Sequence, residues 1–434
     1  MEKEQEAADH NHTKEEETSL PEELTYADLR ALAPDDYQII DIRDQYAFEY
    51  GHIPGAMNVP LNELYARAEG FAYDMKTISE SEVAHMRAEG FVSDLESVTE
   101  TDDLHTRTEG FSRRKLLVLC CKSGSVSREP AAVLRASGFR AVSLAGGYYA
   151  WMRSQLTQGN KAKQAEQSIR KTFHKELWSR FAQAVKKYDL VQPGDRIAVC
   201  ISGGKDSMLM AKLFQELQWH RKFPFKVEFL VMDPGYSPEN REVIEKNADA
   251  LSVPIHVFES NIFESVYHVE KNPCYLCARM RRGYLYREAQ ALGCNKIALG
   301  HHYDDVIETI LIGMLYGGQV QTMMPKLHST NFPGMELIRP MYLIREADIL
   351  RWRDYNGLHF IQCACRFTDT CTTCSPGNTG SKRVEIKNLI RQMKEVNPQV
   401  EYNIFRSVEH VNLQTVIGYK DKDGLHSFLD SYNE

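Results

Sequence analysis

The stretch RIAVCISGGKDSMLMAKLFQEL, residues 196–217, decides the fold class of the larger part of this chain. Its apolar run Ile197–Ile201 has the length and composition of a buried β-strand. A turn with two glycines follows, and a helix-compatible segment begins directly after it. A buried strand that turns at once into a helix is typical of a parallel sheet, so the sequence predicts an α/β fold.

The residues of this turn suit the binding of phosphate: Ser202, Gly203, Gly204, Lys205, Asp206 and Ser207. Glycine lets the backbone approach an anion closely, and the serine hydroxyls and the helix N-terminus supply hydrogen-bond donors. Lys205 can neutralise phosphate charge. The spacing is not that of a G-x-x-x-x-G-K-[ST] loop, so a phosphate-binding loop of another class is expected.

A second segment, KIALGHHYDDVIETILIGML at residues 296–315, repeats the order of strand, turn and helix. Another predicted strand, VEFLVMD, ends at Asp233. The carboxyl ends of parallel strands meet at one edge of a sheet, so the polar residues there should line a nucleotide crevice: Asp233, Gly300, His301, His302, Asp304 and Asp305. The carboxylates could hold Mg²⁺ against ATP phosphates, and Asp305 could act as a general base. A zinc site is the alternative for the His and Asp cluster.

The SGGKDS turn resembles the PP-loop of ATP pyrophosphatases, which cleave ATP to AMP and pyrophosphate while adenylating a substrate. Together with the pair Cys274 and Cys277, the arginines that follow it, and LGHHYDD, residues 171–420 resemble the tRNA 2-thiocytidine synthetase branch of that superfamily. The resemblance implies ATP and Mg²⁺ as cofactors and tRNA as substrate. It also implies the reaction, in which the C2 oxygen of a base, expected to be cytidine, is adenylated and replaced by sulfur.

In that family three cysteines hold a [4Fe-4S] cluster whose free iron binds the transferred sulfur. Cys274 and Cys277 match the first two ligands, and Cys363 is favoured over Cys365 as the third. The chain departs from the family here, because CxxC is usual at the third site and this chain has CxC followed by CxxC. Two zinc alternatives therefore stay open. One is a site within residues 363–374, and the second is a four-cysteine site made by the two CxxC pairs.

Basic residues in two places favour an RNA substrate. Arg279, Arg281 and Arg282 follow the CxxC motif beside tyrosines, which suits a phosphate backbone with exposed bases, although a solvated helix face is the plain alternative. Residues 158–192 form a basic, helix-compatible segment. Its apolar residues recur every four positions and should form a packing face rather than a chemical site: Ile169, Phe173, Leu177, Phe181 and Val185.

A cysteine loop defines a separate unit earlier in the chain. CKSGSVS, residues 121–127, lies between the predicted strand Lys115–Cys120 and a helix-like stretch. Backbone N–H groups in such a loop would favour a thiolate and nucleophilic sulfur chemistry. With DIRDQYAFEYGHIPGAMNVP before it and VSLAGGYYAW after it, the loop resembles that of a rhodanese domain. The resemblance implies that Cys121, not Cys120, carries a persulfide, and Val126 replaces an arginine common in that family.

Composition sets the remaining expectations. The net charge is −8, but residues 1–30 hold ten acidic and three basic residues and account for −7 of it, so a basic face elsewhere is compatible with RNA. We expect an acidic disordered tail over 1–20, a rhodanese-like domain over 21–157, a basic helical linker over 158–192, a PP-loop domain over 193–420 and a C-terminal tail over 421–434. A twenty-residue repeat, at about 66–111, is expected to be a looped-out insertion. No apolar run spans a membrane and no signal peptide is evident, which favours the cytoplasm.

The functional hypothesis is a fusion in which the rhodanese domain, loaded by a donor such as a cysteine desulfurase, feeds sulfur to a PP-loop tRNA sulfurtransferase. Covalent linkage raises the effective concentration of the carrier beside its acceptor. A lysidine-forming ligase would use ATP in the same way but leaves the cysteines unexplained. Two further hypotheses are a sulfurtransferase acting on a uridine or a small molecule, and a sulfur or redox sensor without catalysis. The sequence does not decide whether the protein forms a homodimer.

Overall fold

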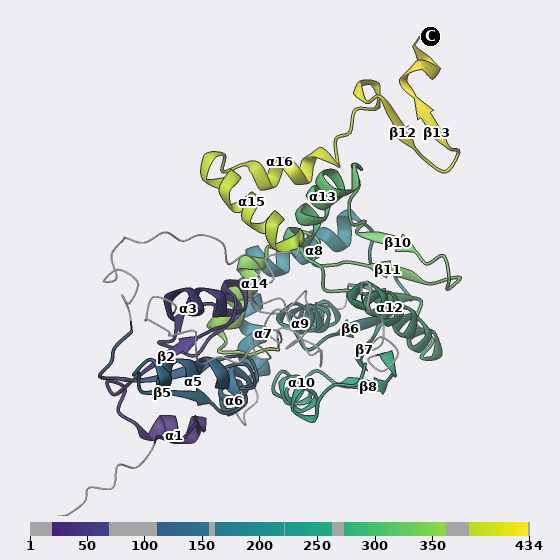
Figure 1. Cartoon of the computed structure of the whole chain (residues 1–434). Helices are drawn as coiled ribbons and strands as arrows, with labels where there is room; N and C mark the ends of the chain where they lie inside the picture. Colours follow the sequence, from purple (N-terminus) through teal and green to yellow (C-terminus); the bar gives the residue numbers. More distant parts are fainter. Residues whose placement is uncertain are drawn as a thin grey trace, which may run out of the picture. The chain divides into compact units, whose positions relative to one another are not determined.

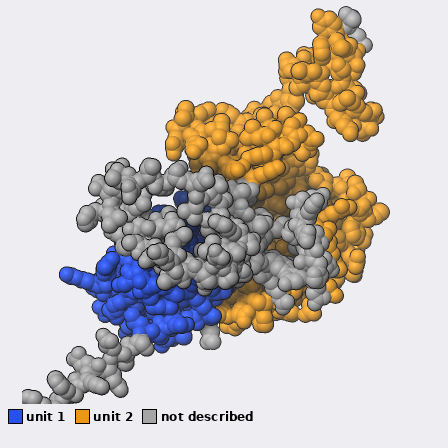
Figure 2. Space-filling model, viewed as in Figure 1, with its two compact units in different colours: residues 1–48, 52–151 blue, residues 49–51, 152–434 orange. Residues whose placement is uncertain are grey.

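The computed structural model describes residues 20–68, 111–155, 161–220, 222–262, 273–361 and 382–432. The chain forms two compact units, one comprising residues 1–48 and 52–151 and the second comprising residues 49–51 and 152–434 (Figure 2). Nearly all of the twenty-residue repeat, and therefore its predicted looped-out insertion, lies outside the described residues.

The first unit is built on a five-stranded parallel sheet in the order β1-β5-β4-β2-β3. Its strands are β1 (Glu23–Leu24), β2 (Tyr37–Asp41), β3 (Met57–Asn58), β4 (Leu116–Cys120) and β5 (Ala141–Leu144). Its helices are α1 (Tyr26–Ala31), α2 (Gln45–Tyr50), α3 (Leu61–Ala68), α5 (Arg128–Ala136) and α6 (Gly147–Gln155). Every residue of β4 is buried, as expected for the central strand of a sheet covered on both faces.

The second unit holds a six-stranded sheet in the order β10-β11-β9-β6-β7-β8, in which only β10 runs antiparallel to its neighbour. The strands are β6 (Arg196–Ile201), β7 (Lys226–Asp233), β8 (Ile255–Glu259), β9 (Lys296–Ala298), β10 (Lys326–His328) and β11 (Glu336–Ile338). Figure 1 shows these strands with the helices that connect them. The α/β fold class with a parallel sheet is therefore confirmed.

The helices of the second unit alternate with the strands from β6 to α13, and further helices precede and follow this part. They are α7 (Ala162–Arg170), α8 (Ser179–Lys187), α9 (Lys205–His220), α10 (Pro238–Ala250), α12 (Pro273–Ala291), α13 (Tyr303–Gly317), α14 (Glu346–Tyr355), α15 (Lys382–Val396) and α16 (Val400–Ser407). A π-helical turn, η2 (His174–Trp178), joins α7 to α8. The predicted apolar stripe of this basic segment is buried along its whole length, which confirms it as a packing face.

The C-terminal end of the described chain differs from the prediction. The boundary expected at residue 420 falls inside a β-hairpin of β12 (Gly418–Lys420) and β13 (Leu425–Ser427), with short 3₁₀ turns at Leu413–Thr415 and Phe428–Ser431. The strands are only three residues long, too short to give a periodic signal. The intervening Asp-Lys-Asp-Gly is a turn sequence that could have indicated the hairpin.

The strand order fixes where a ligand can bind in the second unit. From β6 the chain proceeds outward to β7 and β8, and then returns to the opposite side of β6 as β9. The loops that follow β6 and β9 therefore diverge, and they leave a crevice at the carboxyl edge of the sheet. The SGGKDS turn follows β6 and the LGHHYDD turn follows β9, so both predicted motifs lie at this switch point.

Candidate nucleotide and sulfur-transfer sites

The turn after β6 is closed by the two serines that flank it. The hydroxyl of Ser207 lies 3.1 Å from the backbone nitrogen of Ser202 and 3.2 Å from its hydroxyl oxygen, and it donates to the carbonyl of Gly204 at 3.0 Å. Gly203 has a positive φ of 84°, and a Cβ there would lie within 2.5 Å of the Ile244 side chain. Only glycine fits this position, so the loop backbone remains available to an anion.

Lys205, the first residue of α9, is buried and lies between two carboxylates. Its Nζ lies 3.0 Å from Asp206 Oδ1 and 3.1 Å from Glu346 Oε1. Burial opposes the charge of this amine, but the Coulombic attraction of Asp206 and Glu346 outweighs burial and raises the pKa of Lys205. A permanently charged lysine at a helix N-terminus can hold a phosphate group.

The turn after β9 packs directly on the turn after β6. A Cβ on Gly300 would lie 3.3 Å from the backbone nitrogen of Ser207, so glycine allows the two loops to approach. His302 caps α13: its ring accepts from the Asp305 backbone N–H, while the Asp305 carboxylate accepts from the His302 N–H at 3.0 Å. This reciprocal cap fixes the orientation of both side chains at the crevice.

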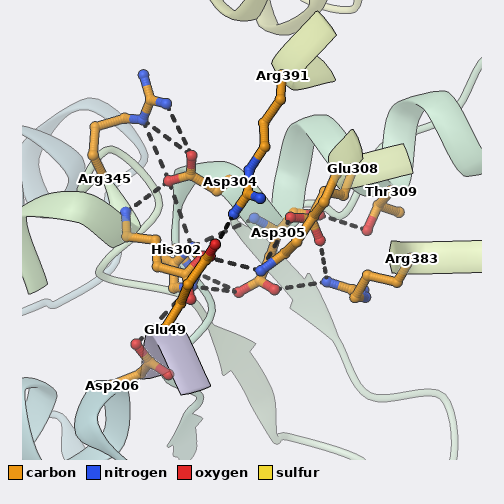
Figure 3. Close-up of polar contacts among 12 residues, drawn as sticks. Glu49, Asp206, His302, Asp304, Asp305, Glu308, Thr309, Arg345, Arg383 and Arg391 are labelled. Atoms are coloured by element: carbon orange, nitrogen blue, oxygen red, sulfur yellow. Dashed lines mark hydrogen bonds and ion pairs between the residues drawn. The ribbon is translucent and has the colours of Figure 1, made fainter. Parts of the chain in front are cut away.

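Five residues that the sequence did not single out complete the charge network around these motifs: Glu308, Arg345, Glu346, Arg383 and Lys387. Figure 3 shows Glu308, Arg345 and Arg383 beside Asp304 and Asp305.

Arg383 of α15 pairs with Asp305 at 2.7 Å and with Glu308 at 2.9 Å. Lys387, one turn later, pairs with Glu346 at 3.0 Å. Arg345 pairs with Asp304 at 2.9 Å, and the backbone N–H of Glu346 also donates to that carboxylate. No local sequence pattern identifies these partners, because they come from elements distant along the chain.

Burial and charge shift the pKa values of this network in different directions. Burial raises the pKa of Glu308 to about 7, although Lys387 and Arg383 oppose the shift. Burial acts in the same direction on Asp305, but its pKa is nevertheless lowered by His302 and Arg383. Burial lowers the pKa of His301 to about 4, so its imidazole is neutral at physiological pH. The site therefore combines an ionised carboxylate with one that titrates near neutrality.

A buried arginine follows β11 at the same edge of the sheet. Arg339 is 7% exposed and donates to the carbonyl of Met324, while its Nε has no partner among the described residues. Burial lowers its pKa to about 10, and the nearby Arg282 adds to the shift. Sequence analysis missed this cation, although its position directly after a buried strand could have indicated it.

Asp233 ends β7, as predicted, and its carboxylate closes the turn that follows. It accepts from the backbone N–H groups of Gly235 and Tyr236 at 2.8 and 2.6 Å and pairs with Arg241 at 3.3 Å. The structure thus brings three predicted strand ends, at Ser202, Asp233 and Gly300, to one edge of the sheet. The role of Asp233 in nucleotide binding stays a prediction.

The helix α12 carries the first predicted cysteine pair and the arginines. Cys274 and Cys277 lie three residues apart at its start, and the side chains of both, like Cys363 and the further cysteines of residues 363–374, lie outside the described residues. Arg279 and Arg282 are exposed, whereas Arg281 donates to the hydroxyl of Tyr236 at 3.3 Å. Over the described side chains, no three His, Cys, Asp or Glu residues are arranged to hold a metal ion. This finding covers the side chains of the His301–Asp305 cluster.

In the first unit, the loop after β4 directs hydrogen-bond donors at Cys121. Its Sγ accepts from the backbone N–H of Gly124 at 3.1 Å and from the hydroxyl of Ser127 at 3.2 Å, and Ser127 contacts Ser143 at 2.9 Å. A Cβ on Gly147 would collide with the carbonyl oxygen of Cys121, so glycine lets the start of α6 close the loop. Donors converging on sulfur stabilise its anionic form.

Cys120 lies in a different environment from its neighbour. It is the last residue of β4 and is fully buried, and burial, followed by the charge of Asp41, raises the pKa of its thiol well above the ordinary value. Asp41 pairs with Arg43 at 2.6 Å, and the Arg43 guanidinium lies 4.1 Å from the Tyr148 ring centroid. These contacts hold the frame of the loop and leave Cys120 as an inert thiol.

Comparison with protein families defines the class of the chain. Residues 25–154 match the rhodanese-like domain and residues 173–365 match the PP-loop domain. The chain is therefore a rhodanese-like domain joined to a PP-loop domain.

Relatives narrow the class to a family. A tRNA-cytidine(32) 2-sulfurtransferase from Alkalilimnicola ehrlichii is 34% identical over 247 residues, covering 56% of this chain and 74% of the relative. The protein of the same name from Vibrio cholerae is 37% identical over 260 residues, with 58% and 80% covered. The chain belongs to the tRNA-cytidine(32) 2-sulfurtransferase family.

Among solved structures, the chain is similar to the U34-tRNA thiolase NcsA from Methanococcus maripaludis with its [4Fe-4S] cluster. The two share 21% identity with a TM-score of 0.42, over 54% of this chain and 79% of that one.

Within the described part of the chain, no helix is both long enough and apolar enough to span a membrane.

Proposed function

We propose that this protein is an ATP-dependent tRNA sulfurtransferase that replaces the C2 oxygen of a cytidine with sulfur, in the cytoplasm. The observation that carries the proposal is the switch-point crevice, where a closed SGGKDS turn, a buried Lys205 and a capped Asp305 meet. Relatives of 34% and 37% identity named tRNA-cytidine(32) 2-sulfurtransferase support both the substrate and the reaction.

In the proposed adenylation step, the turn after β6 and the N-terminus of α9 hold the phosphates of ATP. Lys205 would exchange its contacts with Asp206 and Glu346 for phosphate oxygens, and those carboxylates could then hold Mg²⁺, which when bound would neutralise phosphate charge. The C2 oxygen of the base attacks the α-phosphorus and pyrophosphate leaves. The C2 oxygen of cytosine carries no proton, so Asp305 at this edge is the proposed base for the proton released when sulfur attacks, and His301 remains neutral there.

In the proposed thiolation step, sulfur at the hydrosulfide level attacks C2 of the adenylated base, AMP leaves with the former C2 oxygen, and the S–H proton passes to Asp305. Cys274, Cys277 and Cys363 would hold a [4Fe-4S] cluster, which when bound supplies an iron site for the incoming sulfur. Two of these residues lie three apart at the start of α12, a spacing that suits shared ligation of one cluster. The two zinc alternatives, one within residues 363–374 and one made by the two CxxC pairs, use the same cysteine thiolates as ligands, and metal analysis distinguishes zinc from a cluster.

Cys121 is the proposed carrier of this sulfur, and a thiol reductant that becomes a disulfide supplies the two electrons that release its persulfide sulfur as hydrosulfide. A persulfide on its Sγ would be stabilised by the donors from Gly124 and Ser127, whereas Cys120 lies in the buried strand and receives no such donors in the described loop. A cysteine desulfurase is the proposed source of the sulfur. The linkage of carrier and acceptor in one chain raises the local concentration of the donor.

The decisive experiment is thiolation of tRNA by anaerobically purified full-length protein with ATP, Mg²⁺ and a sulfur source. We expect 2-thiocytidine by mass spectrometry of digested tRNA, and iron and sulfide in the protein. Cys274→Ala should abolish the thionucleoside and the iron while leaving nucleotide binding intact. Zinc without iron would overturn the cluster. ATP consumption that yields another modified base, such as lysidine, would overturn the reaction.

A second experiment tests the carrier. After incubation with a cysteine desulfurase and cysteine, wild-type protein and Cys120→Ser should both gain a persulfide that a thiol reductant removes. Cys121→Ser should gain none. Labelling at Cys120 in the Cys121→Ser variant, or no labelling of the wild type, would contradict the assignment.

A further inference from the structure

The second unit contains a cleft that the proposed chemistry does not use. It has a volume of about 530 Å³ and is lined mainly by η2, α8 and α16, with Tyr303, Leu343, Arg345 and Asp348 completing its wall. Cavities of this size accommodate a ligand of a nucleotide's dimensions. All of its lining residues belong to the described part of the second unit.

The charges in the cleft do not balance. Lys175, Arg180 and Arg406 line it without a carboxylate partner among the described residues: Arg180 contacts only the Gln183 amide oxygen, at 3.4 Å, and Arg406 contacts the hydroxyl of Tyr402. Against these cations, Glu176 is the acidic lining residue with no basic partner in the described chain. These unpaired cations outnumber the unpaired carboxylate of Glu176, which favours a negatively charged ligand.

Three further acidic residues of the cleft are already paired with basic residues, and one of them, Asp348, pairs with Arg351 at 3.1 Å. Glu401 pairs with Arg345 at 2.6 Å and Lys394 at 2.8 Å. Glu409 pairs with Lys187 at 2.6 Å. These basic partners reduce the repulsion between the carboxylates and an incoming anion.

An aromatic surface accompanies the free cations. The ring of Tyr402 is 51% exposed and carries the Arg406 guanidinium at 5.4 Å from its centroid. Exposed aromatic rings beside arginines are the elements with which proteins stack unpaired bases and hold a phosphate backbone. A free phosphate or an acidic peptide would not need this ring.

The cleft is connected to the nucleotide site by consecutive polar contacts. Arg345 in its wall pairs with Asp304 (Figure 3), and Asp304 accepts from the Glu346 backbone N–H at 2.7 Å. Glu346 pairs with Lys205 of the phosphate turn at 3.1 Å. A ligand in the cleft therefore lies beside the crevice in which a base would be activated.

We propose that this cleft binds a single-stranded segment of the RNA substrate, with phosphates on Lys175, Arg180 and Arg406 and a base stacked on Tyr402. The site is distinct from the arginines of α12. This inference rests on the proposed function, because it takes tRNA to be the substrate. It adds that the nucleotides flanking the modified base are held by α8 and α16.

The test compares two double variants of the full-length protein that remove equal charge. Arg180→Gln/Arg406→Gln removes cations from the cleft. Lys163→Gln/Lys186→Gln removes exposed cations of α7 and α8 that do not line it. Binding of unmodified tRNA is measured at several salt concentrations, and ATP binding is measured in parallel.

We expect the cleft variant to bind tRNA about tenfold or more weakly and to lower the slope of log K against log salt by about 1.4, since about 0.7 is lost per phosphate contact with a single strand. ATP affinity should not change, and the control should remain near wild type. Tyr402→Ala should weaken tRNA binding, and Tyr402→Phe should retain it, because the stacking face is kept.

Equal weakening by both double variants would overturn the proposal and indicate a general charge effect. Loss of ATP affinity without loss of tRNA affinity would overturn it in favour of a nucleotide subsite. If wild type thiolates tRNA and the cleft variant binds it normally, the cleft proposal alone fails. If wild type neither binds nor thiolates tRNA, the proposed function fails with it.

Discussion

Two buried lysines lie at opposite edges of the same sheet. Comparing them shows how a lysine that can bind a ligand differs from one that only stabilises the fold. Lys205 and Lys296 are each 3% exposed, and each pairs with two carboxylates. Lys205 follows β6 at the carboxyl edge, whereas Lys296 begins β9 at the amino edge. Burial and ion pairing are therefore shared by both and do not by themselves indicate function.

The difference lies in the partners. Lys296 pairs with Asp195 at 2.8 Å and Glu336 at 3.2 Å, whose side chains are 6% and 14% exposed, and it also donates to the carbonyl of Leu190. The partners of Lys205, Asp206 and Glu346, are 29% and 25% exposed. Carboxylates that reach solvent can exchange a lysine for a ligand more readily than less exposed carboxylates can. A ligand can therefore displace the ion pairs of Lys205 at the carboxyl edge more easily than those of Lys296 at the amino edge.

The largest expected effect is on catalysis at the carboxyl edge. Lys205→Met should lower ATP-dependent AMP formation by about 10²–10³-fold, the range found when a fixed charge donor is removed from an active site. The free energy of unfolding of Lys205→Met should fall much less than that of Lys296→Met, because Glu346 keeps its contact with Lys387. Pyrophosphate release assays with tRNA would measure the rate. A rate within about threefold of wild type would contradict the assignment.

At the amino edge, the expected effect is on stability. Lys296→Met leaves Asp195 buried without its cation, whereas Glu336 keeps Lys326 at 3.8 Å, and the variant should lower the free energy of unfolding by about 3 kcal/mol. Urea unfolding followed by circular dichroism measures the change. ATP affinity at low temperature, where the variant remains folded, should equal that of wild type. A matched loss of affinity would show that the two edges are not independent.

The raised pKa of Glu308 predicts that the free energy of unfolding depends on pH. Its pKa is raised from 4.5 to about 7, so between these pH values the folded state binds more protons than the unfolded state. Stability should therefore decrease as pH rises through this window, by up to about 3 kcal/mol. Glu308→Gln mimics the protonated acid and should remove this decrease. Thermal unfolding of both proteins from pH 5 to pH 8 tests it, and parallel curves would exclude Glu308 as the titrating group.

The smallest expected effect concerns the contact between the two turns. In Gly300→Ala the added Cβ would lie 3.3 Å from the Ser207 nitrogen, which should displace the phosphate turn slightly and weaken ATP binding about fivefold. Gly317→Ala is the control, because nothing lies within 4 Å of its Cβ. Calorimetric titration with ATP compares them. Equal affinities for the two variants would mean that the turns move independently.

Local patterns in the sequence were sufficient for the strands that carry chemistry and for both sulfur and nucleotide loops. The apolar run before Ser202 is β6, the run before Cys121 is β4, and the family assignments that these motifs suggested are confirmed. The individual roles of the site residues stay predictions. These features were readable because each consists of contiguous residues whose backbone conformation and chemistry are set within about twenty positions.

Tertiary structure alone decided which charges meet. Glu346 lies 141 positions from Lys205, and Arg383 lies 78 positions from Asp305, so no periodicity links them. The same holds for the cleft, whose walls come from α8 and α16 at distant points of the chain. The sequence determined the elements and their reactive loops because those depend on local backbone and side-chain preferences. The pairing of buried charges depends on the strand order, which brings distant loops to one edge of a sheet.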